Sequence, residues 1–399
     1  MQFTEKTLKT LEYDKIIEML AEVCATEGAR ARAYALMPSD DADTVRERQQ
    51  RTDDAKRLIA AKGYPSFFAP ESVVPAADRA YKGATLSPRE LLDVAALLRC
   101  AAGLCDYVEI NIPFETVLEP IFRRMLPNRE LERRITRAIL SEELIADEAS
   151  PTLADIRRKI RNTNNKIKDT LSGYVGGAKI KYLQENIVTM RNGRYVIPVK
   201  AEYRSEIKGL VHDTSSTGAT LFVEPMAVVE ANNELKTLAA EETHEIERIL
   251  SAFSAEVAEF QGAIAANYHN ITDLAFCFAL ATLATNMRAN MPNIKSEQII
   301  QLRRARHPLI PKERVVPIDV SVGGEYDTLI ITGPNTGGKT VTLKTLGLFA
   351  LMAQSGMQIP VAEGSSLGVF SEILVDIGDD SFSMVQRHET EKEHFARVY

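Results

Sequence analysis

The chain has 399 residues, of which 45% are hydrophobic and 26% are charged. This composition excludes an intrinsically disordered protein, and the length allows about two or three domains with separate cores. The formal net charge of −7 excludes a protein that is basic throughout, so any nucleic-acid-binding surface has to come from a local patch of lysine and arginine.

The cysteines and the N-terminal segment indicate the cellular compartment. The four cysteines form no Cys-x-x-Cys pair and have no metal-ligand spacing with histidine, which is typical of reduced thiols in a cytoplasmic protein. Met1 to Asp14 is polar and lacks the apolar segment of a signal peptide, and no apolar run is long enough to span a bilayer. The sequence therefore predicts a cytoplasmic protein without a membrane segment.

Residues 1–150 are predicted to form a helical core. Hydrophobic residues recur at helical spacing from Leu8 to Val23 and again from Leu91 to Leu98. Ser39-Asp40-Asp41 is a predicted N-terminal cap for the next helix, and Gly63 is predicted to end that helix. The carboxylates of this region are scattered along helix faces, so no catalytic pair is predicted here.

Residues 151–290 are predicted to contain a long antiparallel pair of helices, which would form a lever. The outgoing helix, 151–175, has a coiled-coil seam and a basic surface, and Gly173, Gly176 and Gly177 are predicted to break it. The returning helix has a matching seam and an acidic surface. The seam residues are Leu153, Ile156, Ile160, Ile167, Leu171 and Tyr174, then Leu235, Leu238, Ile246, Ile249, Phe253, Val257, Phe260 and Ile264. Two interpretations of the basic run stay open, namely ion pairing between the helices and contact with nucleic acid.

A small β-rich clamp is predicted at the tip of this lever, at about 176–225. Strands are predicted at 194–199 and 219–223, with turns at Asn192-Gly193 and Thr217-Gly218, and a weaker one at 209–213. This tip is locally basic, and such a patch would contact phosphates without reading sequence. The candidate nucleic-acid-binding residues are Lys179, Lys181, Arg191, Arg194, Lys200, Arg204 and Lys208. His212-Asp213 is interpreted as a turn or interface pair, because no nucleophile or metal-ligand set accompanies it.

Residues 291–380 are predicted to begin an α/β nucleotide-binding domain. An apolar helix leads into this region and is predicted to break at Met291-Pro292. Runs rich in β-branched and apolar residues then predict five strands, at 299–302, 315–320, 328–332, 356–361 and 372–376.

The motif with the most specific chemistry follows the third of these predicted strands and opens a helical pattern. Its order of strand, G-x-x-x-x-G-K-[ST] and helix is the context of a phosphate-binding loop (P-loop). The motif consists of Gly333, Pro334, Asn335, Thr336, Gly337, Gly338, Lys339 and Thr340. Glycines let backbone N–H groups surround a polyphosphate, Lys339 would reach the outer phosphates, and the Thr340 hydroxyl would ligate magnesium. The alternative is a glycine-rich turn with a surface lysine.

Asp376 ends an apolar run, as the acidic residue of a Walker B strand does. Such an acid would bind the magnesium ion. No glutamate follows Asp376 to orient a water molecule, so magnesium binding is the less favoured interpretation of this residue.

The sequence resembles the MutS-type ATPases, and in particular the type-two MutS branch of bacteria. The resemblance runs from the N-terminus to about Asp380 and is carried by the P-loop with its helix, by Arg306-His307-Pro308-Leu309-Ile310, by 191–199, by 212–225 and by 232–235. It implies an all-α core with a long coiled-coil lever and a small β-rich clamp, followed by a P-loop ATPase domain that binds ATP and Mg²⁺ and forms a homodimer. It also implies an ATP-driven clamp that acts on branched DNA to suppress recombination, or on rRNA in collided ribosomes.

Two departures from the family pattern qualify this expectation. Residues 381–399 diverge where a signature segment that completes the partner's ATP site is expected, and the Asp-Glu end of the true Walker B strand is missing. The C-terminal nuclease module of the family is missing too. We therefore expect a truncated or frame-shifted chain with a partial ATPase domain at 291–380, which binds ATP with little turnover. The resemblance also places His307, Val316 and Pro317 near the nucleotide, although a structural role for His307 is favoured.

A second hypothesis comes from a different class of protein. If the sheet after residue 291 lacks its later strands, it would expose an apolar edge, and the chain would be a non-enzymatic helical-arm or interaction protein with a vestigial P-loop. A P-loop kinase is disfavoured, because no acceptor-substrate domain or lid follows the loop.

Overall fold

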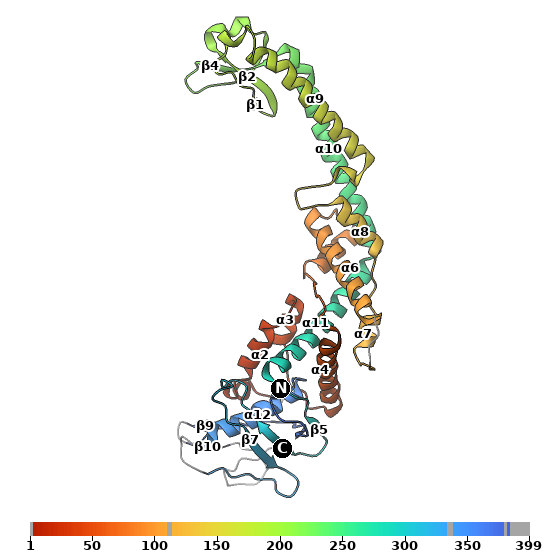
Figure 1. Ribbon diagram of the computed structural model, residues 1–399, viewed down its shortest axis with the longest axis vertical. Helices are drawn as coiled ribbons and strands as arrows, with labels where there is room; N and C mark the ends of the chain where they lie inside the picture. Colours follow the sequence, from red (N-terminus) through yellow and green to blue (C-terminus); the bar gives the residue numbers. More distant parts are fainter. Residues whose placement is uncertain (1–2, 110–113, 333–337, 379–380, 384–399) are drawn as a thin grey trace. The chain divides into compact units, whose positions relative to one another are not determined.

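The computed structural model describes residues 3–109, 114–332, 338–378 and 381–383 (Figure 1). Contacts divide the chain into two units. The first consists of Met1–Pro75, Ala96–Arg129 and Gly262–Tyr399, and the second of Ala76–Ala95 and Glu130–Gln261. Helices predominate in the described residues and the sheets are small, which agrees with the mixed α and α/β class expected from the sequence.

The first unit is built mainly from helices. Thr4, Thr26 and Asp41 accept hydrogen bonds from the first turns of three of them, so the predicted cap at 39–41 is confirmed, as is the end at Gly63. The helices of this unit are α1 (Glu5–Thr10), α2 (Tyr13–Glu22), α3 (Glu27–Tyr34), α4 (Ala42–Lys62), α7 (Glu119–Arg123), α11 (Gln261–Met287) and α12 (Lys339–Gln354). Two further helices, α5 (Val73–Tyr81) and α6 (Pro88–Glu109), contribute residues to both units.

Two helices form the centre of the first unit. The last ten residues of α12, from Thr345 to Gln354, are all buried. Most of α11 between Ile271 and Ala284 is buried as well. A helix that is apolar all round is stable only inside a core, so these two helices are covered by the others. The predicted break at Met291 comes too late, because α11 ends at Met287 and Arg288 adopts a φ of 51°.

Two small sheets belong to the first unit. One has the strand order β5-β8-β6-β7, formed by β5 (Asn293–Lys295), β8 (Ser366–Gly368), β6 (Ile300–Ala305) and β7 (Ile318–Val322). The other is an antiparallel pair of β9 (Asp376–Gly378) and β10 (Ser381–Ser383). The predicted strand at 299–302 is thus confirmed, whereas the one predicted at 315–320 begins only at Ile318.

Three predicted strands of this region do not form, and backbone hydrogen bonding explains two of them. The segment 356–361 has only an isolated bridge between Ile359 and Asn290, because Gln49 and Thr52 of α4 donate side-chain hydrogen bonds to its carbonyls. In 372–376 only the last residue lies in a strand, and the Thr7 hydroxyl donates to the carbonyl of Ile373. Backbone groups satisfied by side chains do not need a neighbouring strand.

The third missing strand, 328–332, precedes the P-loop motif. Only Thr328 lies in a bridge there, and the side chain of Ile330 is 71% exposed. Apolar composition alone does not make a strand, since a strand also needs a paired backbone on its flank.

The second unit contains the predicted antiparallel helix pair, α9 (Pro151–Val175) and α10 (Met226–Glu259), which Figure 1 shows side by side. Of the predicted seam, Leu153, Ile156, Ile167, Leu171, Leu238, Ile249, Phe253 and Val257 are buried. Two boundaries differ from the prediction. Gly173 lies inside α9, which ends at Val175 with Gly176 as its cap, and α10 ends at Glu259 before Phe260. The other helices of this unit are α8 (Arg129–Ala138) and the short 3₁₀ helices η1 (Asp147–Ala149), η2 (Ile180–Tyr182) and η3 (Ala201–Glu206).

A four-stranded antiparallel sheet connects α9 to α10, where the sequence predicts three strands. Its strands are β1 (Thr189–Arg191), β2 (Arg194–Lys200), β3 (Gly209–Thr214) and β4 (Thr220–Pro225), in the order β1-β2-β4-β3. Asn192 and Gly193, with φ of 51° and 75°, form the hairpin turn between β1 and β2. A hydrophobic cluster that includes Ile167, Leu171, Ile197, Val199 and Val223 joins this sheet to the helix pair. We call the segment 176–225 the tip.

Candidate nucleotide site and nucleic-acid surface

The described part of the P-loop motif consists of Gly338, Lys339 and Thr340, at the start of α12. Gly338 has a left-handed backbone with a φ of 79°, which glycine adopts without steric cost. Its carbonyl accepts hydrogen bonds from the N–H of Thr342 at 2.9 Å and from the Thr342 hydroxyl at 3.1 Å. Thr340 is exposed, so its hydroxyl is accessible in the first turn. The predicted phosphate-binding residues 333–337 lie outside the described residues.

The far end of α12 is fixed by side chains of α2 and α4 and by its own Gln354. Gln49 donates to the carbonyls of Ala353 and Met357, each at 2.8 Å, and the Tyr13 hydroxyl lies 2.7 Å from the Ser355 hydroxyl. Gln354 is completely buried and donates to the carbonyls of Ser39 and Phe370. Of these acceptors, the carbonyl of Ala353 lies in the last turn of α12, where helical partners are lacking. The helix axis is therefore anchored at one end.

The middle of α12 is fixed by close packing. A Cβ atom at Gly347 would lie 2.8 Å from a methyl carbon of the buried Leu11, so a larger residue there would require the Leu11 side chain to shift. Lys344 and Glu12 form an ion pair at 3.4 Å on the same side. These contacts hold the middle of α12 against the α1–α2 connection.

This arrangement fits a phosphate group and its magnesium ion. The N-terminal end of a helix carries partial positive charge, and the first turn of α12 is partly accessible while the helix is buried from Thr345 to Gln354. Lys339 and Thr340 stand at its first two positions, from which an ammonium and a hydroxyl group would reach a ligand at that end.

Other residues considered near the nucleotide have different surroundings. His307 is 6% exposed, and its Nδ1 accepts a hydrogen bond from the N–H of Leu309 at 3.3 Å. Burial lowers the pKa of His307, so the ring is neutral at neutral pH. These contacts agree with the structural role expected for it. Val316, in contrast, is 76% exposed, and Asp376 is the first residue of β9.

The seven basic candidates of the tip separate into two groups by residue type. The three arginines bond within the fold. Arg194 pairs with the completely buried Glu224 at 2.7 Å, and Arg204 donates to the carbonyls of Ile207 and Gly209 at 2.9 and 2.7 Å. Arg191 donates to the carbonyl of Met190, pairs with Asp213 at 3.3 Å and lies 4.1 Å from the Phe222 ring centre. Arg194 and Arg204 therefore support the sheet, and contact of the seven residues with nucleic acid stays a prediction.

Glu224 is the centre of a buried polar network that joins the sheet to α10. Besides Arg194, it contacts Nε2 of His212 at 2.5 Å and accepts a hydrogen bond from Asn232 at 2.7 Å. Asn232 also exchanges two hydrogen bonds of 3.1 Å with the backbone of Tyr195 in β2. His212 thus lies in β3 and contacts Glu224, whereas its neighbour Asp213 pairs with Arg191, so the two do not form the pair that the sequence suggested.

Three lysines of the tip lie over tyrosine rings. Lys179 and Lys181 are exposed, whereas Lys200 is half-buried and also donates to the carbonyl of Lys181 at 3.5 Å. The ammonium of Lys179 is 4.2 Å from the ring centre of Tyr174, that of Lys181 is 4.9 Å from Tyr182, and that of Lys200 is 5.9 Å from Tyr203. We call these six residues the Lys–Tyr surface. Lys208 is exposed as well. The sequence analysis missed the tyrosines, although each is within five positions of its lysine.

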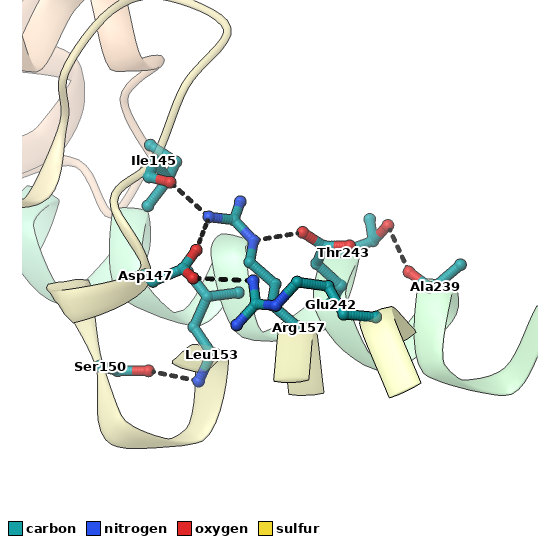
Figure 2. A network of polar contacts seen from close by, with 9 residues as sticks. Ile145, Asp147, Ser150, Leu153, Arg157, Ala239, Glu242 and Thr243 are labelled. Atoms are coloured by element: carbon teal, nitrogen blue, oxygen red, sulfur yellow. Dashed lines mark hydrogen bonds and ion pairs between the residues drawn. The ribbon is translucent and has the colours of Figure 1, made fainter. Parts of the chain in front are cut away.

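The opposite end of the α9–α10 pair contains a second polar network (Figure 2). Arg157 donates to Asp147 at 2.7 Å, to Glu242 of α10 at 2.6 Å and to the carbonyl of Ile145 at 2.6 Å. Arg161 also pairs with Asp147, at 3.1 Å. Arg158 and Lys159 pair with Asp155 on their own helix. For these four basic residues, intramolecular pairing is the interpretation that the contacts support.

Comparison with known proteins identifies the family. The model of MutS domain V matches residues 329–393, which include the P-loop motif and α12. A protein named endonuclease MutS2 from Acetivibrio thermocellus is 42% identical over 398 residues, which cover 99% of this chain and 50% of that protein. Proteins of the same name from Lachnoclostridium phytofermentans and Symbiobacterium thermophilum are also 42% identical, over 99% of this chain and 50% and 49% of their own lengths.

The chain belongs to the MutS family. Its identity to the proteins named MutS2 over almost its whole length confirms the type-two resemblance expected from the sequence. The chain spans about half the length of the curated relatives it matches. The MutS domain V match extends beyond residue 380, into the part predicted as a divergent tail. Within the part of the chain that the structure describes, no helix is both long enough and apolar enough to cross a bilayer.

Proposed function

We propose that this MutS-family chain is an ATP-dependent, nucleic-acid-binding clamp protein, in which nucleotide binds at the start of α12 and nucleic acid binds at the tip. The P-loop motif that runs into the anchored helix α12 is the observation that carries this proposal. The family membership supports it, because the match to MutS domain V includes the motif.

In this proposal the triphosphate lies against the N-terminal end of α12. Backbone N–H groups of the motif from Gly333 to Gly338 would surround the phosphates, and the Lys339 ammonium would neutralise their outer charge. The Thr340 hydroxyl would be a magnesium ligand, and the ion would neutralise charge on the phosphates. Because the far end of α12 is anchored by Gln49, a displacement at its first turn would be transmitted to the helical core rather than lost in a flexible joint.

The nucleic-acid part of the proposal rests on the exposed lysines of the tip, which would contact phosphate groups. Branched DNA and ribosomal RNA are both compatible with phosphate contacts of this kind, so the proposed roles are suppression of recombination and rescue of collided ribosomes. A homodimer that shares ATP between two subunits is part of the same proposal. The name of the relatives, an endonuclease, describes those longer proteins.

The experiment that tests the nucleotide site is ATP binding by this chain, measured by calorimetry with Mg²⁺, with Lys339→Ala as the test variant. Lys295→Ala is the matched control, because Lys295 is an exposed lysine of β5 in the same unit. We expect binding that Lys339→Ala abolishes and Lys295→Ala preserves. At about a hundred times Kd, ATP should add about 2.7 kcal/mol to the free energy of unfolding of the first unit.

A second candidate function is favoured by one observation, the exposed apolar segment before the motif. Residues 328–332 form no regular strand, and Ile330 is 71% exposed, as expected if the P-loop is vestigial and the chain is a non-enzymatic helical-arm protein. Absence of ATP binding, or binding that survives Lys339→Ala, would contradict our proposal and favour this candidate.

A further inference from the structure

The tyrosines of the Lys–Tyr surface are fixed in position by the core of the tip. Tyr174 and Tyr182 pack against the hydrophobic cluster that contains Leu171 and Leu183. Tyr203 stands beside Tyr182, with ring centres 5.4 Å apart and an interplanar angle of 51°, and is 36% exposed. Part of each ring is thus buried against protein or another ring, and part is accessible.

The polar atoms of these rings are not used by the fold. In the described residues, the hydroxyl groups of Tyr174, Tyr182 and Tyr203 make no hydrogen bond to protein. Each accessible face is instead occupied by a lysine ammonium on a flexible chain. A tyrosine needed only for stability would be expected to bury its ring or to bond its hydroxyl.

The pairing of an ammonium with an aromatic ring suits a ligand that carries both a negative charge and a flat aromatic group. A nucleotide is such a ligand, because its phosphate attracts the ammonium and its base stacks on the ring. An exposed cation–π contact changes an equilibrium only about 2- to 5-fold, whereas a base stacked on an aromatic side chain contributes about 5- to 150-fold. A base that displaces the lysine ammonium from the tyrosine ring is therefore favoured, because the displaced ammonium can then contact the adjacent phosphate.

We propose that the Lys–Tyr surface binds an unpaired nucleic-acid strand, with bases stacked on Tyr182 and Tyr203 and phosphates contacted by Lys179, Lys181 and Lys200. This inference rests on the nucleic-acid part of the proposed function and narrows its target. In a duplex the bases stack on each other and their faces are covered, so only unpaired bases offer a free face to a tyrosine ring. The surface thus favours single-stranded regions of branched DNA or folded RNA over continuous duplex.

The test measures binding of the full chain to fluorescein-labelled oligothymidylate of about 16 nucleotides, by fluorescence anisotropy. Oligouridylate and a DNA duplex of the same length are measured in parallel, so that DNA and RNA sources of the strand are distinguished. The variants are Tyr203→Ala, Tyr203→Phe and Tyr182→Ala. Tyr81→Ala is the matched control, because Tyr81 is a tyrosine of α5 that is 72% exposed and lies outside the Lys–Tyr surface.

We expect the single strand to bind more tightly than the duplex. Tyr203→Ala should weaken binding of the strand by about 5- to 150-fold, while Tyr203→Phe and Tyr81→Ala bind like the unchanged chain. Tyr203 lies outside the hydrophobic cluster, so its alanine variant is expected to fold, and circular dichroism checks this. Photocrosslinking of an iodouracil-substituted strand should label Tyr182 or Tyr203. Lys179→Ala should lower the slope of log Kd against log salt concentration by about one, whereas the tyrosine variants leave this slope unchanged.

Two results would overturn the inference in distinguishable ways. Binding of single strand and duplex that is unaffected by both alanine variants would leave the nucleic-acid function intact and refute stacking at this surface. Absence of binding to any of the three oligonucleotides would refute the nucleic-acid part of the proposed function, and this inference with it, while ATP binding would remain separately measurable.

Discussion

The two ends of the α9–α10 pair use positive charge differently. At the end near residue 150, Arg157 is only 18% exposed in its side chain and connects α9 to α10 and to η1. At the tip, the ammonium groups of Lys179 and Lys181 lie on the surface over tyrosine rings. At one end, therefore, the arginine forms ion pairs within the protein, whereas at the other end the lysines are exposed to solvent.

This difference follows residue type more closely than position. The guanidinium group is planar and has five donors, so one arginine can satisfy several fixed acceptors, as Arg157 and Arg204 do. The ammonium of lysine is a compact charge on a flexible chain, which suits a mobile partner. Even within the tip, Arg194 is internal while the neighbouring lysines are external. A count of basic residues thus overstates a binding surface when arginines with buried partners are included.

The largest expected effect comes from removing the acceptor of the internal arginine at the tip. Glu224→Ala would leave Arg194, 20% exposed in its side chain, without its ion pair, would remove the partner of His212, and would leave Asn232 with the Tyr195 carbonyl as its remaining acceptor. We expect the tip to lose about 3–5 kcal/mol of stability against local unfolding. Hydrogen exchange of the amides of β2 and β4 measures this loss.

The control for this variant is Glu202→Ala, which removes an exposed glutamate of η3. Its exchange should match that of the unchanged chain within about 0.5 kcal/mol. If Glu224→Ala also left the hydrogen exchange of β2 and β4 unchanged, this result would contradict the distinction between internal arginines and external lysines at the tip.

A smaller effect is expected at the opposite end. Arg157→Ala removes hydrogen bonds to Asp147, Glu242 and the carbonyl of Ile145, and should reduce the stability of the helix pair by about 1.5–3 kcal/mol. Arg158→Ala is the matched variant, because Arg158 is 68% exposed and pairs with Asp155 on its own helix. It should cost less than about 0.5 kcal/mol. Urea unfolding followed by circular dichroism compares the two, and equal costs would contradict the assigned roles.

The smallest effect is a pH dependence at the same end. Glu245 accepts hydrogen bonds from Arg248, at 2.8 Å, and from Ser150, at 2.6 Å, which lower its pKa from 4.5 to about 2. Because the folded-state pKa is the lower one, the stabilisation is complete above pH 4.5 and is lost as the pH falls through about 2. The loss should be about 1–2 kcal/mol, since Arg248 is largely exposed.

The measurement compares the chain with Glu245→Gln, which keeps the size of the side chain and does not titrate. Between pH 5 and pH 2, the difference in unfolding free energy between the two proteins should shrink. A difference that stays constant over this range would show that the Glu245 carboxylate contributes nothing through its charge.

The sequence predicts the second unit better than the first for a physical reason. The seam residues Leu153 and Leu171 follow a helical period, and the turn Asn192-Gly193 pairs strands that are adjacent in the chain, so both signals are local. In the first unit, the segments 328–332, 356–361 and 372–376 are apolar, but their pairing depends on backbone from distant parts of the chain. Gln49 and Thr52 donate hydrogen bonds to carbonyls of the second segment, and no local sequence pattern predicts these bonds.

The candidate sites are likewise predictable from the sequence only where their signals are local. The P-loop motif and the start of α12 are recognisable because their residues are contiguous. The sequence shows that basic residues are clustered at the tip. It does not show which of them have partners within the fold, and those partners distinguish the arginines from the lysines. Glu224 lies thirty positions from Arg194 in the sequence, and only the sheet brings the two together. The lysine–tyrosine pairs are close in sequence, yet such neighbours are common and become significant only when the rings are seen to be fixed.

The junction between β4 and α10 has a mechanical consequence. The strand ends at Pro225 and the helix begins at Met226, with no linker, and the N–H of Met226 bonds to the carbonyl of Lys208. Asn232, two turns into the helix, bonds to both backbone groups of Tyr195 as a neighbouring strand would. The sheet and the start of α10 therefore form one rigid unit. A force applied to the sheet is transmitted along the axis of α10, because no flexible linker lies between them.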